Sequence, residues 1–462
     1  MRRTRRLVLA LILVALPVAI LPTAHGPDLP ILAKARNEPV KRSQAASQVL
    51  DLDARDALHN RWLTARFEQV LPRVMRREGI DMWIVICREH AEDPVYLSLV
   101  PQPSMFAWRL TMFVYTDRGA AGVERLTVNR YGGGDLHKSF PSYYTAAWDP
   151  ESVDPWDRLA QIVRARKPQK IAINESPTFA FADGLSASLK ARLVQALGPE
   201  YARRLVSSER LAVGWLETRT ADELEFYNEI VAVTHRVAAE AFSPAVITPG
   251  VTTIDDLESW VRRRFAALDL DAWFPPMFYI ARNASAGPAS RVVQRGDLLR
   301  CDIGFRYVGL ASDIQQVAYV LREGETAPPR GLADALAKGN RLQDILAAEF
   351  RVGLTGNAVL AAALARARAE GLVPRIYSHP LGYHGHAAGS RIGLPDMQDG
   401  VPGMGDYPVY ANTVWAIELG VGVPVPEWNN QQVQMALEED AAFTAAGIVF
   451  LDGRQTRLRV IR

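Results

Sequence analysis

Two aspartates stand in the stretch RCDIGFRYVGLASDI, and both have apolar neighbours typical of buried strands. If the hairpin turn centres on Tyr307 and Val308, Asp302 and Asp313 fall nearly opposite each other on neighbouring strands. Two unpaired buried carboxylates repel each other, and divalent cations relieve this repulsion because such metals favour hard oxygen ligands. The alternative is that each aspartate pairs with an arginine or with backbone N–H groups.

Three further groups change the balance between these two readings. They are His379 in SHPLGYHGH, Glu418 in VWAIELG and Glu438 in ALEEDAAF, and both glutamates stand inside apolar, strand-like runs. Each of these residues alone is ordinarily structural or surface-facing. Five acidic or imidazole groups within apolar segments favour a shared metal centre over separate accidents.

Taken in order, these segments resemble the pita-bread metallopeptidases, which include Xaa-Pro aminopeptidase, prolidase and methionine aminopeptidase. The resemblance spans Thr218 to Gly453. It rests on GDLLRCDIGF with SDI eleven residues after the first aspartate, on SHPLG with a second histidine seven residues after the first, on TVWAIELG, and on LEED followed by AAFT. The segment upstream is similar to the creatinase-type N-terminal domain of aminopeptidase P and prolidase.

The resemblance implies two divalent metal ions, with manganese the leading expectation and cobalt, iron or zinc as alternatives. Asp302 would bind one ion, His379 and Glu418 would bind the other, and Asp313 and Glu438 would bridge them. Such a pair of ions lowers the pKa of a shared water, which as hydroxide attacks the scissile carbonyl that one ion polarises.

Two residues would carry the remaining catalytic roles. His386 matches the family's second active-site histidine and would hydrogen-bond the tetrahedral intermediate. Glu418 would also relay a proton from water to the leaving amine. His384 has no counterpart in the family, and we expect it to be a loop residue.

The sequence departs from the family around this ligand set. The family's additional histidine upstream of the first aspartate is missing, since no histidine occurs between His235 and His379. Gln315 stands where a threonine is usual, Ala436 where an arginine is usual, and Arg375 where a histidine is usual. A hydrolase of another small amide and an inert, metal-retaining binding protein therefore stay open, whereas the ligand set argues against metal-free creatinase chemistry.

The expected substrate is a peptide with proline at its second position, from which the first residue is released. The upstream domain carries this expectation by resemblance, and the stretch Trp273-Phe274-Pro275-Pro276 could line an apolar pocket. Preference for dipeptides or longer peptides stays open.

The helices and strands that must position these residues fall into two predicted domains. Residues 48–212 alternate helical patterns with the strand-like runs DMWIVICRE, LTMFVYTD and KIAINE, which predicts an α/β domain. Residues 213–462 begin with a long helix that Thr220 caps with Glu223 in a capping box. Helices and strands then segregate, which predicts an α+β, pita-bread catalytic domain.

The first residues form a separate segment. Four arginines precede an apolar run from Leu7 to Leu21, which predicts a signal peptide or membrane anchor over residues 1–26, followed by a polar linker over 27–47. We therefore expect an exported protein, periplasmic or otherwise extracytoplasmic, that either loses this segment or is anchored by it.

Composition excludes two further classes. A net charge of +2 over 462 residues gives no indication of nucleic-acid binding. Cys87 and Cys301 fall in different predicted domains, so we expect two buried thiols and no disulfide scaffold. A homodimer is an open expectation that the sequence does not decide.

Overall fold

The computed structural model describes residues 49–130, 142–287 and 290–462. The predicted signal or anchor (1–26) and the linker (27–47) lie outside the described residues. Within the described ranges, no helix combines the length and apolar character needed to cross a membrane. Both cysteines are free and buried, as predicted.

The N-terminal sheet is mixed, with strand order β4-β3-β2-β1-β5-β6. Strand β1 runs antiparallel to β2 and parallel to β5, and the three predicted strand-like runs are confirmed as β1, β2 and β5. The sheet also contains strands that the sequence pattern did not single out. The bounds are β1 (Met82–Arg88), β2 (Leu110–Asp117), β3 (Val123–Asn129), β4 (Thr145–Ala146), β5 (Ile171–Ile173) and β6 (Leu205–Ser207).

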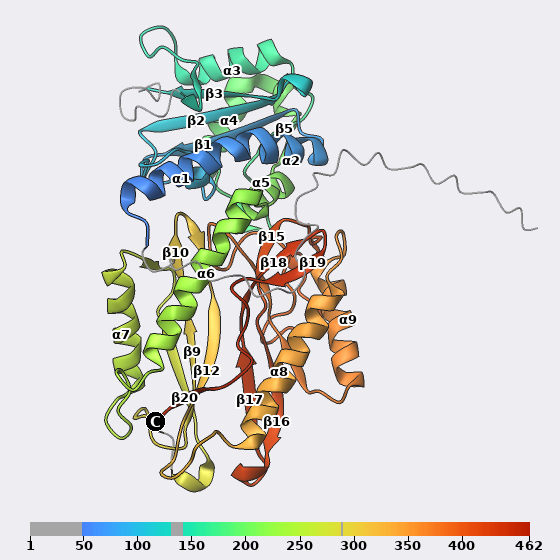
Figure 1. Cartoon of the computed structure of the whole chain (residues 1–462). Helices are drawn as coiled ribbons and strands as arrows, with labels where there is room; N and C mark the ends of the chain where they lie inside the picture. The colour runs from blue at the N-terminus through green and yellow to red at the C-terminus, as the bar shows by residue number, and fades with distance from the viewer. Residues whose placement is uncertain (1–48, 131–141, 288–289) are drawn as a thin grey trace, which may run out of the picture. The chain divides into compact units, whose positions relative to one another are not determined.

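Helices cover both faces of this sheet (Figure 1). Alternate residues of β1 explain why: Met82 and Ile84 pack toward α3 and α4, whereas Trp83 and Val85 pack toward α1, α2 and α5. The predicted boundary after residue 212 falls inside α5. The helices are α1 (Leu52–Ala65), the π-helical turn η1 (Arg66–Val70), α2 (Leu71–Glu78), α3 (Pro155–Arg166), α4 (Ala187–Ala202) and α5 (Glu209–Glu217).

In the C-terminal segment, helices α6 and α7 pack on one group of strands and α8 and α9 on another (Figure 1). Thr220 and Glu223 form the predicted capping box at the start of α6. The helices are α6 (Ala221–Ala241), α7 (Ile254–Ala267), α8 (Arg330–Glu349) and α9 (Gly356–Ala369). The fold is thus the predicted α+β arrangement.

Strands of this segment form four sheets in the described residues, with orders β11-β10-β7, β20-β12-β9-β8, β13-β16-β17 and β14-β15-β18-β19. Their bounds are β7 (Asp271–Ala272), β8 (Met277–Ala281), β9 (Leu298–Ile303), β10 (Phe305–Tyr307), β11 (Leu310–Ala311), β12 (Ile314–Val320), β13 (Pro374–Ile376), β14 (His379–Leu381), β15 (Thr413–Ala416), β16 (Leu419–Val425), β17 (Gln431–Leu437), β18 (Asp440–Thr444), β19 (Gly447–Phe450) and β20 (Arg459–Ile461).

Two runs that we interpreted as single strands are each broken in the middle. The run containing Glu418 divides into β15 and β16, and the run containing Glu438 divides into β17 and β18. Each pair of pieces lies in two different sheets, so the chain passes from one sheet to the other at the glutamate. The expectation that both glutamates lie inside a continuous strand is therefore wrong, because both stand where a ladder is interrupted.

The hairpin carrying the aspartates also differs from the expected one. Tyr307 pairs with Leu310, so the turn centres on Val308 and Gly309, both with positive φ. Asp302 therefore lies opposite Gln315, two positions beyond Asp313. Because side chains alternate along a strand, the two aspartates still share one face, as diagonal neighbours.

A buried ion cluster joins η1 to α6. The Glu223 carboxylate accepts hydrogen bonds from Arg66 Nη1 at 3.0 and 3.1 Å and from Arg219 Nη1 at 3.0 Å, and all three side chains are fully buried. Both guanidinium groups also donate to backbone carbonyls, Arg66 to that of Thr218 at 2.6 Å and Arg219 to that of Leu216. Removing the shared carboxylate would leave two buried cations without an anion.

We therefore predict that Glu223→Gln lowers the free energy of unfolding by about 3–5 kcal/mol. Urea unfolding followed by tryptophan fluorescence measures this change. Glu225→Gln is the control, because Glu225 is exposed on the same helix, and it should change stability by less than about 0.5 kcal/mol. Unfolding of Glu223→Gln at the wild-type urea midpoint would contradict the role given to the cluster.

Candidate metal centre

The structure brings together all five predicted ligand residues. Ligand atoms of Asp302, Asp313 and Glu438 lie within 4.8 Å of one another, and so do those of His379, Glu418 and Glu438. His386 joins Asp313 and His379 in a third such group. Glu438 therefore belongs to two of the groups and connects the aspartates to the imidazole.

Backbone interruptions place these side chains. Asp313 stands between β11 and β12, Glu418 between β15 and β16, and Glu438 between β17 and β18, while His379 opens β14. The breaks lie side by side, since His379 pairs with Ala416 at the end of β15. The side chains at these breaks converge, since their ligand atoms lie within 4.8 Å of one another in overlapping groups.

His379 has the hydrogen-bond pattern of a metal-binding imidazole. Its Nδ1 lies 3.1 Å from the carbonyl oxygen of Pro380, which can only accept, so Nδ1 carries the proton. The lone pair of Nε2 then faces Asp313 Oδ2 at 3.6 Å and Glu438 Oε1 at 3.5 Å. A backbone carbonyl that fixes the tautomer in this way is usual behind a metal ligand.

The electrostatics of the carboxylates point in the same direction. Burial raises the pKa of Asp302, Asp313, Glu418 and Glu438, and neighbouring carboxylates raise the pKa of the first three further. Burial disfavours the charged form of His379 too, and therefore lowers its pKa to about 3. Negative charge is thus costly here unless positive charge is supplied.

The donor set fits divalent metal ions. Among the described residues, Asp313 Oδ1, Glu438 Oε1 and His379 Nε2 are buried without a hydrogen-bond partner. These three atoms are acceptors, so a cation satisfies them and a further acceptor does not. Carboxylate oxygens with one imidazole suit manganese, cobalt, iron or zinc.

His386 lies on the exposed side of this group. Its Nε2 is 3.1 Å from the Tyr377 hydroxyl, and its ring meets that of His379 edge-on at 4.6 Å between centroids. Burial, then the charges of His379 and Arg391, lower the pKa of His386 to about 3. The imidazole is therefore neutral at pH 7, with one N–H to donate.

Trp273 holds the other side of His386. The two rings lie 5.2 Å apart, and the indole Nε1 donates to the Ser312 carbonyl at 2.9 Å. A Cβ at position 385 would overlap the indole, and one at position 304 would overlap both the indole and the Ser312 carbonyl. Gly385 and Gly304 thus allow Trp273 to pack close to the backbone.

His384 lies apart from the ligand groups. Its ring packs on Phe181 with centroids 4.3 Å apart, and it is in none of the candidate metal groups among the described residues. Arg375, another departure from the family pattern, donates to the Pro395 carbonyl at 2.9 Å. Neither residue therefore contributes a ligand atom to the carboxylate cluster.

The sequence reasoning missed three residues close to the ligands. Gln315 Nε2 donates to Glu418 Oε1 at 2.7 Å, and Arg300 donates to Gln315. Arg391 is 8% exposed, and its Nη1 has no hydrogen-bond partner among the described residues. Gln315 had been noted only as a departure, and no local pattern distinguishes Arg300 or Arg391 from surface arginines.

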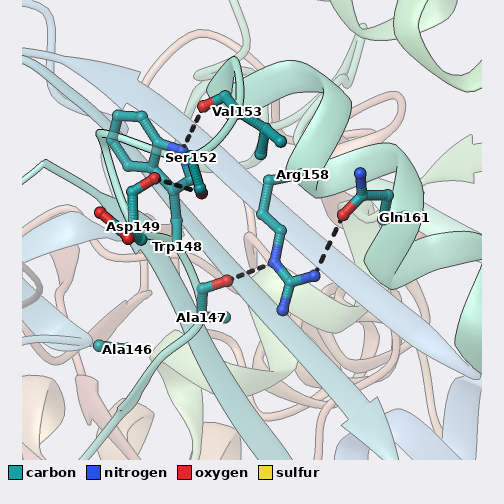
Figure 2. Close-up of a pocket in the computed structure, with 8 residues that line it drawn as sticks. All are labelled: Ala146, Ala147, Trp148, Asp149, Ser152, Val153, Arg158 and Gln161. Atoms are coloured by element: carbon teal, nitrogen blue, oxygen red, sulfur yellow. Dashed lines mark hydrogen bonds between the residues drawn. The ribbon is translucent and has the colours of Figure 1, made fainter.

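A pocket of about 390 Å³ lies elsewhere, beside α3. Figure 2 shows that its polar groups bond to one another: Arg158 donates to Gln161 at 3.1 Å, and the Trp148 indole donates to the Val153 carbonyl at 2.7 Å. Groups already paired in this way offer little to a reaction. We therefore place the chemistry at the carboxylate cluster.

Comparison with known families agrees with this placement. Residues 225–447 match the model of metallopeptidase family M24, and all five predicted ligand residues fall in that range. The C-terminal domain belongs to metallopeptidase family M24. The chain is therefore a metallopeptidase. A search of curated protein sequences found no match.

Solved structures share the fold of the M24 chain over most of its length. X-Pro aminopeptidase from Thermotoga maritima MSB8 is 20% identical, with a TM-score of 0.59, over 84% of this chain and 99% of that one. Xaa-Pro dipeptidase from Bacillus anthracis is 16% identical, with a TM-score of 0.53, over 88% and 99%. The N-terminal domain of FACT complex subunit SPT16 from Cicer arietinum is 13% identical, with a TM-score of 0.51, over 89% and 100%.

We predict that Asp313→Asn and Glu438→Gln each lose at least one bound metal ion per chain: if these residues bridge two ions, as the family resemblance implies, a neutral amide could not replace the carboxylate. Elemental analysis of protein dialysed against manganese measures the loss. Asp396→Asn, at an exposed position, is the control and should keep the wild-type content. Two ions per chain in either test variant would contradict the bridging roles.

Proposed function

We propose that this M24 metallopeptidase releases the first residue of peptides whose second residue is proline, and that it uses two divalent ions, manganese foremost. The observation that carries the proposal is the convergence of the five predicted ligand residues in overlapping groups that Glu438 connects, one of which contains the unpartnered Nε2 of His379. Asp302, Asp313, His379, Glu418 and Glu438 would hold the ions. When bound, such ions activate water and polarise a carbonyl.

The chain's own groups would supply the proton chemistry. Glu418, whose Oε1 accepts a hydrogen bond from Gln315, would also take a proton from water and pass it to the leaving nitrogen. His386 would donate its N–H to the oxygen that gains negative charge. Tyr377 and Trp273 hold that imidazole in place from two sides.

Substrate choice would depend on groups around this centre. Phe274 packs against Trp273 with centroids 4.4 Å apart and the ring planes tilted by 58°, which supports an apolar surface for the proline ring. The guanidinium of Arg391 is buried, and it acts electrostatically on Tyr377 and Glu418. We assign it to the substrate's C-terminal carboxylate, since an unpaired buried cation calls for an anion. Dipeptides would then be preferred.

A metal-retaining binding protein is the second candidate. The absence of the family's upstream histidine favours it, and so does a fold neighbour whose name denotes no enzyme. A hydrolase of another small amide would share the same ligand set. Release of amino acids from defined peptides separates these candidates, because only a peptidase produces them.

We also propose that the protein is exported. The apolar run from Leu7 to Leu21 after four arginines supports this proposal. Its N-terminal segment would either be removed or stay as an anchor.

We predict that manganese-loaded protein cleaves Ala-Pro at least about tenfold faster, in kcat/KM, than Ala-Ala, because only proline fills a rigid apolar subsite. Amino-acid analysis of the products measures both rates. Faster release from Ala-Ala would reject proline specificity. Equal rates for Ala-Pro and its C-terminal amide would reject only the role proposed for Arg391 and leave the rest of the proposal standing.

For His386→Ala we expect a loss in kcat greater than the about 100–1,000-fold that is typical of one oxyanion donor, because this chain lacks the family's additional histidine upstream of the first aspartate. Metal content should not change. Steady-state kinetics with elemental analysis of the same sample measure both quantities.

His384→Ala is the matched control, since His384 packs on Phe181 and lies in none of the metal groups of the described residues. Small and equal losses in both variants would remove His386 from the mechanism. Loss of a metal ion in His386→Ala would instead make it a ligand of the third group.

A further inference from the structure

Gln315 lies behind two of the ligand carboxylates at once. It is 2% exposed on β12, opposite Asp302 on β9 and bridged through its backbone to Glu438. Its side-chain Nε2 donates to Glu418 Oε1 at 2.7 Å and to Glu438 Oε2 at 2.9 Å. Both amide hydrogens are thus used, one on each carboxylate.

Arg300 determines which way round this amide stands. Arg300 Nη1 donates to Gln315 Oε1 at 2.9 Å, and a guanidinium can only donate. Ionised carboxylates can only accept, so reversing the amide would set donor against donor and acceptor against acceptor. The chemistry of the three neighbours therefore leaves one orientation.

Arg300 is itself held in place. Its guanidinium lies over the Tyr279 ring at 4.1 Å, and the two residues face each other across β9 and β8. It also acts electrostatically on Asp302, Glu418 and Glu438. Tyr279, Arg300 and Gln315 thus form a row that ends on the two glutamates.

A threonine at this position could not donate two hydrogen bonds from its side chain. A hydroxyl donates one hydrogen and cannot serve two carboxylates together. The glutamine that departs from the family pattern therefore restrains Glu418 and Glu438 as a pair. It leaves the other oxygen, Glu438 Oε1, facing His379 Nε2 at 3.5 Å.

We propose that Gln315, oriented by Arg300, is a positioning residue that selects which oxygen of Glu418 and of Glu438 is free to bind a cation. The assignment rests on the proposed metal site and adds to it a hydrogen-bond relay particular to this chain. Such outer partners are worth about 10–100-fold in metal affinity.

Titration of the metal-free full-length chain with manganese alone tests this assignment. Gln315→Leu, which keeps the volume but removes both donors, should weaken binding of at least one ion by about 10–100-fold. Arg300→Met should weaken it too, because the amide loses its orienting donor. Arg300→Lys should recover most of the affinity, because an ammonium group can still donate to Gln315 Oε1.

Gln316→Leu is the matched control. Gln316 is the next residue on β12 and is equally buried, but its Oε1 accepts from Arg459 at 2.9 and 2.6 Å on the opposite face. The Gln316→Leu substitution should lower thermal stability without changing manganese affinity. Equal loss of affinity in Gln316→Leu would show general damage to the strand and overturn the assignment.

The titration separates this inference from the proposed function because it uses no peptide. Wild-type affinity in Gln315→Leu, with two ions bound by the wild type, would overturn the inference and leave the metal site intact. A wild-type chain that binds no manganese would overturn both. Normal metal affinities with no peptide cleavage would count against the peptidase proposal alone.

Discussion

Repulsion among four neighbouring carboxylates, two buried and two half-buried, is the constraint on which the rest of the site depends. Asp302 lies on β9, and Asp313, Glu418 and Glu438 stand between strands. Burial raises the pKa of all four carboxyl groups. Charges this close in a poorly solvated space destabilise a fold unless cations or protons neutralise them. The Gln315 amide, which Arg300 orients, and the nearby Arg391 guanidinium supply partial relief.

The backbone meets this constraint by interrupting its sheets at one level. Where β15 passes into β16 and β17 into β18, the ladders change partners, and the residue at each change faces inward. The apolar halves on either side then bury against α8 and α9, which fixes the position of each break.

Residue type and order were enough to single out five residues that the structure brings together, since charged groups inside apolar runs are rare and distinctive. The breaks were missed because Ile417 and Leu419 are both buried, so the apolar run continues through Glu418. The role of Gln315 depends on a register between distant strands, which no local pattern encodes. Arg391 was missed because arginine in a loop is ordinarily solvated.

The packing of Trp273 limits how this site can change over evolutionary time. Its indole fills the room left by Gly304, between β9 and β10, and by Gly385, which follows β14. Any side chain at either glycine would displace the indole and, with it, the imidazole of His386. Substitution of either glycine is thus restricted by the space that the indole occupies and not by chemical reactivity. A smaller residue would have to replace Trp273 before either glycine could change. Lineages that altered the aromatic side chain could then explore loop sequences closed to this one.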